Sequence, residues 1–135
     1  MVAVPVHRFS EAGVVATFER IAELTRLPDD WDSYGGMSPS VKAAAGAAAA
    51  VSTIVDAYPL SSTESIMPLG LMPTPSGGID LVWRTPSTQL TIGVSRSGEY
   101  SYLLVRSRDR APTFDEQDGV PLERAVSLID EFLPG

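Results

Sequence analysis

The sequence predicts an α+β fold, in which an antiparallel β-meander of three to four strands packs with two N-terminal helices and one C-terminal helix. Apolar residues recur at helical spacing over residues 10–59 and again after Pro121, which is typical of helices that bury one face. Between these segments, apolar and polar residues alternate in runs separated by short polar turns, which is typical of antiparallel strands with one packed face. A chain of 135 residues is expected to form a single domain over residues 1–135.

Capping residues and prolines bound the two N-terminal helices. We expect the first helix to begin at Ser10, an N-cap residue, and to end before Pro28, because proline disfavours helical geometry in the residue before it. Its expected buried stripe consists of Val14, Val15, Phe18, Ile21, Ala22 and Thr25. We expect the second helix to start with Ser38 as N-cap and Pro39 as its first residue, and to end at Pro59. Its expected buried face consists of Val41, Ala44, Ala45, Ala48, Ser52 and Val55, with Val51, Ile54 and Tyr58 beside them.

The second half of the chain changes from helical spacing to alternation. This period predicts three strands, with a fourth at the front of the sheet, over residues 69–72, 79–84, 90–94 and 100–105. Residues 106–119 are rich in charge and contain proline and glycine, so we expect a charged loop there. The last helix is expected to open at Pro121 and to bury Leu122, Ala125, Val126, Ile129 and Phe132.

Composition and charge limit the function. With 44% apolar and 20% charged residues, the chain has a globular composition. The absence of cysteine excludes disulfides, thiol catalysis and cysteine zinc sites, and suits a cytoplasmic protein. We expect neither a signal peptide nor a membrane span, because no apolar run is long enough. The formal charge of −7 argues against binding to nucleic acids in general and to anionic membranes. It favours either simple solubility or a partner protein that is itself basic.

Residues 27–40, LPDDWDSYGGMSPS, join the two N-terminal helices and carry three carboxylates within four positions, those of Asp29, Asp30 and Asp32. Carboxylates so close together could hold a hard cation. The spacing from Asp30 imitates the start of a calcium-binding loop, but Val41 stands where the bidentate glutamate of such a loop is required. We therefore expect no metal ligands, and no motif in the chain indicates a cofactor.

A structural role explains the same loop more simply. Aspartate side chains accept hydrogen bonds from backbone donors in turns, and the pair Gly35 and Gly36 would supply positive φ angles. We expect Trp31 and Tyr34 to pack over the helical hairpin. The loop would then position the two helices, and any function in it would use its exposed aspartates or Tyr34 at a partner surface.

The hexapeptide at residues 31–36, W-D-S-Y-G-G, resembles the W-D-G-Y-G-A loop of a group of small, uncharacterised bacterial proteins. These proteins also carry a proline-flanked turn and a strand that ends in tryptophan, which residues 73–83, P-T-P-S-G-G-I-D-L-V-W, match in order and separation. The two segments cover less than a fifth of the chain, and the sequence departs from the pattern at Ser33 and Gly36. The resemblance implies a bacterial or phage origin and a shared fold, and it brings no activity and no functional residue.

Two further features are candidate binding residues. Trp83 is expected to be either a core residue or, beside an exposed tyrosine, an anchor for a partner. Arg106, Arg108 and Arg110 form a basic cluster, which is either part of a mobile, charge-balanced loop or a docking loop for carboxylates or phosphates. The lone histidine, His7, has no companion for a zinc site or a catalytic triad.

These observations lead to a preferred hypothesis and two alternatives. We expect a small acidic non-enzymatic protein-binding module of the antitoxin, immunity or phage-inhibitor type. The first alternative is a small-ligand-binding protein or a carboxylate-dependent enzyme that uses Asp29, Asp30 and Asp32, with Tyr34 as an orienting hydroxyl. The second is a subunit of a homo-oligomer. We identify no catalytic residue, and the candidate binding residues are Asp29, Asp30, Trp31, Asp32, Tyr34, Trp83, Arg106, Arg108 and Arg110.

Overall fold

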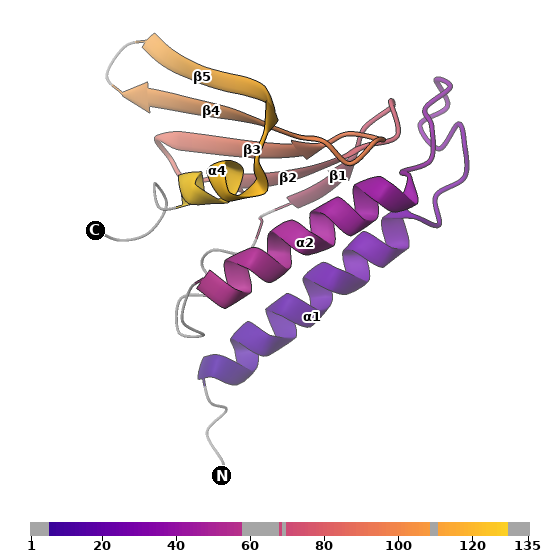
Figure 1. Ribbon diagram of the computed structural model, residues 1–135, viewed down its shortest axis with the longest axis horizontal. Coiled ribbons are helices and arrows are strands. Elements are labelled where there is room, and N and C mark those ends of the chain that lie inside the picture. The colour runs from indigo at the N-terminus through magenta and orange to yellow at the C-terminus, as the bar shows by residue number, and fades with distance from the viewer. Residues whose placement is uncertain (1–5, 58–67, 69, 109–110, 130–135) are drawn as a thin grey trace.

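The computed structural model describes the backbone of residues 6–57, 68, 70–108 and 111–129, and within these ranges the side chains from residue 13 onward except that of Arg108. The elements follow one another along the chain as shown in Figure 1: α1 (Val6–Leu24), α2 (Val41–Ala57), β1 (Gly70–Pro73), β2 (Ile79–Arg84), β3 (Thr88–Val94), β4 (Tyr100–Arg108), β5 (Ala111–Val120) and α4 (Leu122–Ser127).

The described strands form one antiparallel sheet in the order β1-β2-β3-β4-β5, so that each strand pairs with the next along the chain. The predicted α+β class and the antiparallel meander are confirmed. The predicted number of three to four strands is too low, because the described residues form a sheet of five. The strand predicted over residues 69–72 corresponds to β1, at one edge of this sheet.

The helices cover one face of the sheet. Alternate residues of the strands are buried on this face, and they form a single core with residues of α1, α2 and α4. The sheet residues in this core are Leu71, Ile79, Leu81, Trp83, Leu90, Ile92, Val94, Tyr102 and Leu104. The strand residues between them lie on the opposite face, which we call the open face because no described helix packs on it. Burial of one face and exposure of the other is the usual state of an antiparallel sheet.

The buried face of helix α2 is rotated from the predicted one and overlaps it at Val51 and Ile54. Its buried residues are Ala43, Gly46, Ala47, Ala50, Val51 and Ile54, whereas Val41, expected to be buried, is 81% exposed. In an alanine-rich helix almost every face is apolar, so the spacing of apolar residues does not select one. The face that contains Gly46 is buried, and the lack of a side chain there permits a close approach: the Tyr100 hydroxyl donates a 2.8 Å hydrogen bond to the carbonyl oxygen of Gly46.

Helix α1 begins one turn earlier than predicted, at Val6 rather than at Ser10, since no glycine or proline separates these residues. Its core residues are Ile21 and Leu24, with Phe18 packed against them, whereas Val15 is 54% exposed. The predicted stripe was therefore placed slightly too far around the helix. Figure 1 shows α1 and α2 side by side, as expected for a helical hairpin.

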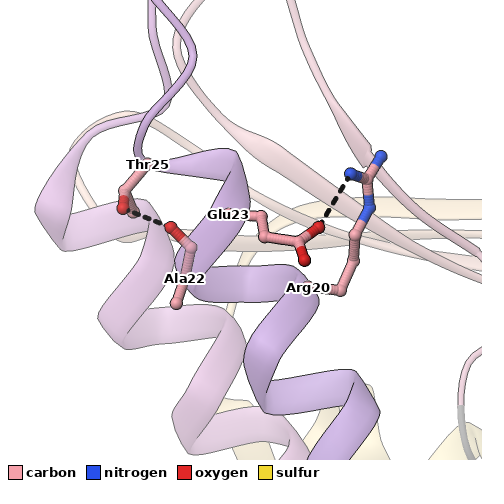
Figure 2. A network of polar contacts seen from close by, with 4 residues as sticks. All are labelled: Arg20, Ala22, Glu23 and Thr25. Atoms are coloured by element: carbon pink, nitrogen blue, oxygen red, sulfur yellow. Dashed lines mark hydrogen bonds and ion pairs between the residues drawn. The ribbon is translucent and has the colours of Figure 1, made fainter.

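The last turns of α1 carry polar contacts on the surface (Figure 2). Arg20 and Glu23 form an ion pair of 3.6 Å in which both side chains are about half exposed, and such pairs stabilise a helix by only about 0.3–0.5 kcal/mol. The Thr25 hydroxyl donates to the carbonyl oxygen of Ala22 at 2.6 Å. The helix depends on its buried face far more than on these contacts.

Strand β5 and the last three residues of β4 replace the predicted charged loop of residues 106–119. β5 pairs with β4 from Ala111 to Val120, with a shift in register between Tyr100 and Ser101, and it forms the edge of the sheet in Figure 1. Most of its residues are exposed on both sides, so it lacks the alternation from which a strand is recognised. Proline and acidic residues along such an edge discourage pairing with other chains.

The C-terminal helix follows the prediction. Pro121 precedes α4, which begins at Leu122. Ala125, Val126 and Ile129 are buried as expected. Leu122, also expected to be buried, is partly buried and packs against the core, and Phe132 lies outside the described residues.

Substitution of Gly46 tests the close approach of α2 to the sheet. A Cβ atom at Gly46 would lie 2.5 Å from Cγ1 of Val94, and overpacking of this kind costs about 1–3 kcal/mol, more than the gain of about 1 kcal/mol in helix propensity. We expect Gly46→Ala to lower the free energy of unfolding by about 1 kcal/mol, as measured by urea denaturation. Gly13→Ala is the matched control: it adds a methyl group with no heavy atom within 4 Å and should stabilise α1 by about 0.5–1 kcal/mol. Equal stability of the two variants would contradict the close packing of α2 on β3.

Candidate functional site

The loop between α1 and α2 is held by its own aspartates. Asp29 Oδ1 accepts a hydrogen bond of 2.9 Å from the backbone N–H of Ser38, and Asp30 Oδ1 accepts one of 2.6 Å from Gly35. The N–H of Asp30 donates to the carbonyl oxygen of Gly36 at 2.6 Å. These bonds fold the loop back on itself and satisfy backbone donors that no regular element uses.

Asp32 closes the centre of the loop. Its Oδ1 atom accepts hydrogen bonds from the backbone N–H groups of Tyr34, at 3.0 Å, and Gly36, at 2.8 Å. These bonds, that from Tyr34 most strongly, stabilise the charged carboxylate and hold the pKa of Asp32 below its ordinary value. A Cβ atom at Gly36 would lie 2.7 Å from both carboxylate oxygens of Asp32. A side chain at position 36 would therefore displace the Asp32 carboxylate from its place in the loop.

Three residues of this loop adopt the left-handed backbone region. φ is 63° at both Asp30 and Ser33 and 82° at Gly35. The prediction of positive φ was therefore right for Gly35 and wrong for Gly36. Ser33 stands where the resembled loop pattern carries glycine, and its backbone angle is one that favours glycine.

The two aromatic side chains of the loop have different surroundings. The Trp31 indole N–H donates to the carbonyl oxygen of Met37 at 2.8 Å, so that this side chain ties the two ends of the loop together. Tyr34 is 92% exposed. The expectation that Tyr34 packs over the helical hairpin is therefore wrong, because the left-handed residues on either side turn its side chain into solvent.

The loop is also attached to the sheet. The N–H of Met37 donates to Pro75 O at 2.8 Å and the N–H of Ser40 to Gly77 O at 3.0 Å, so the loop lies against the β1–β2 turn. Figure 1 shows the loop at the same end of the molecule as this turn and the β3–β4 turn. The Ser40 hydroxyl donates to Arg96 O at 2.6 Å in the β3–β4 turn. Three segments that are distant in sequence thus meet at one end.

Ser40, and not the predicted Ser38, is the N-cap of α2. The helix begins at Val41, and Ser40 Oγ accepts a 3.0 Å hydrogen bond from the N–H of Ala43. Ser38 has another role, because its backbone N–H donates a hydrogen bond to the Asp29 carboxylate. Two serines flank Pro39, and the contacts with the β1–β2 and β3–β4 turns determine which one caps the helix.

A shallow depression lies where these segments meet, and we call it the α2 hollow. Its volume is about 670 Å³, and it is lined by Ser40, Val41, Lys42, Ser76, Ser95, Arg96 and Ser97. The Arg96 side chain crosses Gly77, where a Cβ atom would lie 2.9 Å from Nη1, and Nη1 lies 3.7 Å from the sulfur of Met37. The hollow therefore combines hydroxyl groups and two cationic side chains with the exposed apolar side chain of Val41.

The remaining candidate residues that the structure describes are separate from this end of the molecule. Trp83 is 3% exposed and belongs to the core, so it cannot anchor a partner. Arg106 and Arg108 lie in β4 rather than in a mobile loop, and Arg110 lies outside the described residues. Nothing in the sequence indicates that Arg96 belongs with the loop, because only folding brings residues 37 and 96 together.

No family model, curated protein or solved structure matches this chain. Within the described residues, no group of three or more histidine, cysteine, aspartate or glutamate side chains could hold a metal ion. No helix among these residues is long and apolar enough to cross a membrane.

The acid sensitivity of the loop tests the role of Asp32. Because folding lowers the pKa of this carboxyl, its charge stabilises the fold above the ordinary carboxyl pKa of about 4, and this contribution is lost as the pH falls through the lower pKa of the folded state. In Asp32→Asn an amide oxygen can accept the same bonds without charge. At about pH 6 we expect the urea concentration at the midpoint of unfolding to be lower for the variant than for the wild type. This difference between the two midpoints should become smaller by about pH 3. Asp56→Asn, at an exposed position near the end of α2, controls for the lost charge. A difference that stays constant with pH would contradict this role.

The backbone angle at Ser33 gives a second prediction. A side chain in the left-handed region costs about 1–2 kcal/mol, and the extra freedom of glycine in the unfolded chain offsets about 0.5–1 kcal/mol of this. We expect Ser33→Gly to raise the free energy of unfolding by about 0.5–1 kcal/mol, measured by thermal denaturation. Ser87→Gly, at an exposed turn position without positive φ, should destabilise the protein. If Ser33→Gly destabilised it as well, Ser33 would not occupy the left-handed region in solution.

Proposed function

We propose that this chain is a non-enzymatic protein-binding module that recognises its partner with the α1–α2 loop and the adjoining α2 hollow. The observation that carries the proposal is the exposure of Tyr34, at 92%, on a loop whose backbone is fixed on both sides of it. Tyrosine is enriched among the residues that dominate binding energy at protein interfaces. A rigid loop presents such a side chain with little loss of conformational entropy on binding.

Further exposed side chains in the loop and at the start of α2 support a protein partner. Met37 and Val41 are 39% and 81% exposed, and Lys42 and Arg96 line the hollow beside Val41. Exposed aromatic and apolar side chains that occur together with charged groups on one segment are typical of an interface with an apolar centre and a polar rim. The hollow offers a partner side chain a place to insert.

The use of the loop carboxylates favours this proposal over a carboxylate-dependent enzyme or a cation site. Asp29, Asp30 and Asp32 each accept backbone hydrogen bonds within the loop. A general base needs a carboxylate that can reach a substrate proton, and these carboxylates instead maintain the shape that presents Tyr34. An antitoxin, immunity or phage-inhibitor role is a specific form of the proposal that suits the small size and the charge of −7.

Site-specific cross-linking tests the proposal. We would replace Tyr34 with the photoreactive amino acid p-benzoyl-phenylalanine and irradiate the cells that produce the protein. The expected result is a covalent adduct with one other protein, identified by mass spectrometry. The matched control carries the same amino acid at Val15, which is 54% exposed on α1 and should give no such adduct.

Two outcomes would overturn the proposal. Equal adduct formation from positions 34 and 15 would indicate random collisions. An adduct formed only with a second copy of this chain would favour the homo-oligomer alternative, and light scattering would then show a dimer.

A further inference from the structure

A row of five paired residues crosses the open face of the sheet near the end that carries the loop. The pairing register places Met72 of β1 opposite Asp80 of β2, then Gly93 of β3, Ser101 of β4 and Asp118 of β5. Because paired residues of neighbouring strands point to the same face, the absence of a side chain at Gly93 leaves a gap in the middle of this row.

The gap at Gly93 is part of a second depression, which we call the Asp80 hollow. Its volume is about 200 Å³, and it is lined by Thr74, Ser76, Asp80, Gly93, Val94, Ser95 and Ser101. A Cβ atom at Gly93 would lie 2.8 Å from Ser101 Oγ and 3.2 Å from Asp80 Oδ1. A carboxylate from one side and a hydroxyl from the other therefore approach the same point above the sheet.

Among the described residues that line the Asp80 hollow, Asp80 carries the one charged side chain. Partial burial disfavours its charged form and raises the pKa of its carboxyl above the ordinary value. The Asp80 carboxylate has no partner within the described part of the chain: its side chain makes no hydrogen bond or ion pair there. A half-buried carboxylate without a partner gains most from a cationic hydrogen-bond donor.

We propose that the Asp80 hollow receives a lysine or arginine side chain of the partner protein, whose cationic group donates hydrogen bonds to Asp80 and Ser101. The inference rests on the proposed function, because it names the chemistry of the partner bound by the α2 hollow. Ser76 and Ser95 line both hollows, so one partner segment can reach from the α2 hollow across the turns to the open face. The charge of −7 favours a basic segment in this position.

Titration of the isotope-labelled full-length protein with side-chain analogues, followed by NMR of the backbone amides, tests this inference. The probes are the Nα-acetyl methylamides of lysine and arginine, with that of norleucine as the uncharged control. We expect saturable shifts at Asp80, Gly93 and Ser101 with the two cationic probes and none with norleucine. Asp80→Asn should weaken this binding by about tenfold or more, as expected for the loss of a charged hydrogen bond.

Two further variants control for the fold and for total charge. Gly93→Ala, which fills the gap between Asp80 and Ser101, should also weaken the binding of the cationic probes. Asp56→Asn removes the same charge from the far end of α2 and should leave their affinity within about twofold of the wild type. The dispersion of amide signals in each variant reports whether the fold is intact.

The inference would be overturned if norleucine shifted the same amides equally, or if a correctly folded Asp80→Asn variant bound the cationic probes as the wild type does. Tighter binding of putrescine than of the lysine analogue would assign the hollow to a small amine and overturn the assignment to a protein side chain. These outcomes are distinct from failure of the proposed function, which equal adduct formation from positions 34 and 15 would show.

Discussion

The conformation of the α1–α2 loop depends on the need to satisfy backbone N–H groups in a segment that is neither helix nor strand. Asp29, Asp30 and Asp32 meet this need by accepting hydrogen bonds from four backbone donors. Once these bonds form, the chain is committed to a compact turn with left-handed residues. Exposure of the Tyr34 side chain is a direct consequence of that turn.

The same loop determines the shape of the protein surface at this end of the sheet. Its contacts with Pro75, Gly77 and Arg96 bring the start of α2 against two β-turns, and the α2 hollow is the space left between them. The Asp80 hollow has a different origin, since it arises from the pairing register and a glycine in β3. The α2 hollow and the Asp80 hollow, which differ in the charge of their side chains, thus adjoin each other because rigid segments meet at this end.

The sequence was sufficient where a residue's role depends on its near neighbours. The strand β2 and the burial of Ile79, Leu81 and Trp83 follow from alternation, although Val82 on the other face is buried as well. The aspartates of the loop are recognisable as acceptors because their donors lie close in sequence. The sequence was insufficient where contacts with distant segments determine the conformation of a residue. β5 is exposed on both sides and is a strand only because β4 pairs with it. The choice of Ser40 over Ser38 as the helix cap depends on Arg96, and the approach of Asp80 to Ser101 depends on the register of three strands.

Amide hydrogen exchange in the loop tests the central claim most directly, which is that carboxylates fix this segment and thereby present Tyr34. We predict that the amides of Gly35, Gly36 and Ser38, which donate to Asp30, Asp32 and Asp29, exchange more slowly than those of an unstructured peptide by about tenfold or more. Exchange at the rate of an unstructured chain would show that the loop is not held in this way, and Tyr34 would then not be a rigidly presented contact.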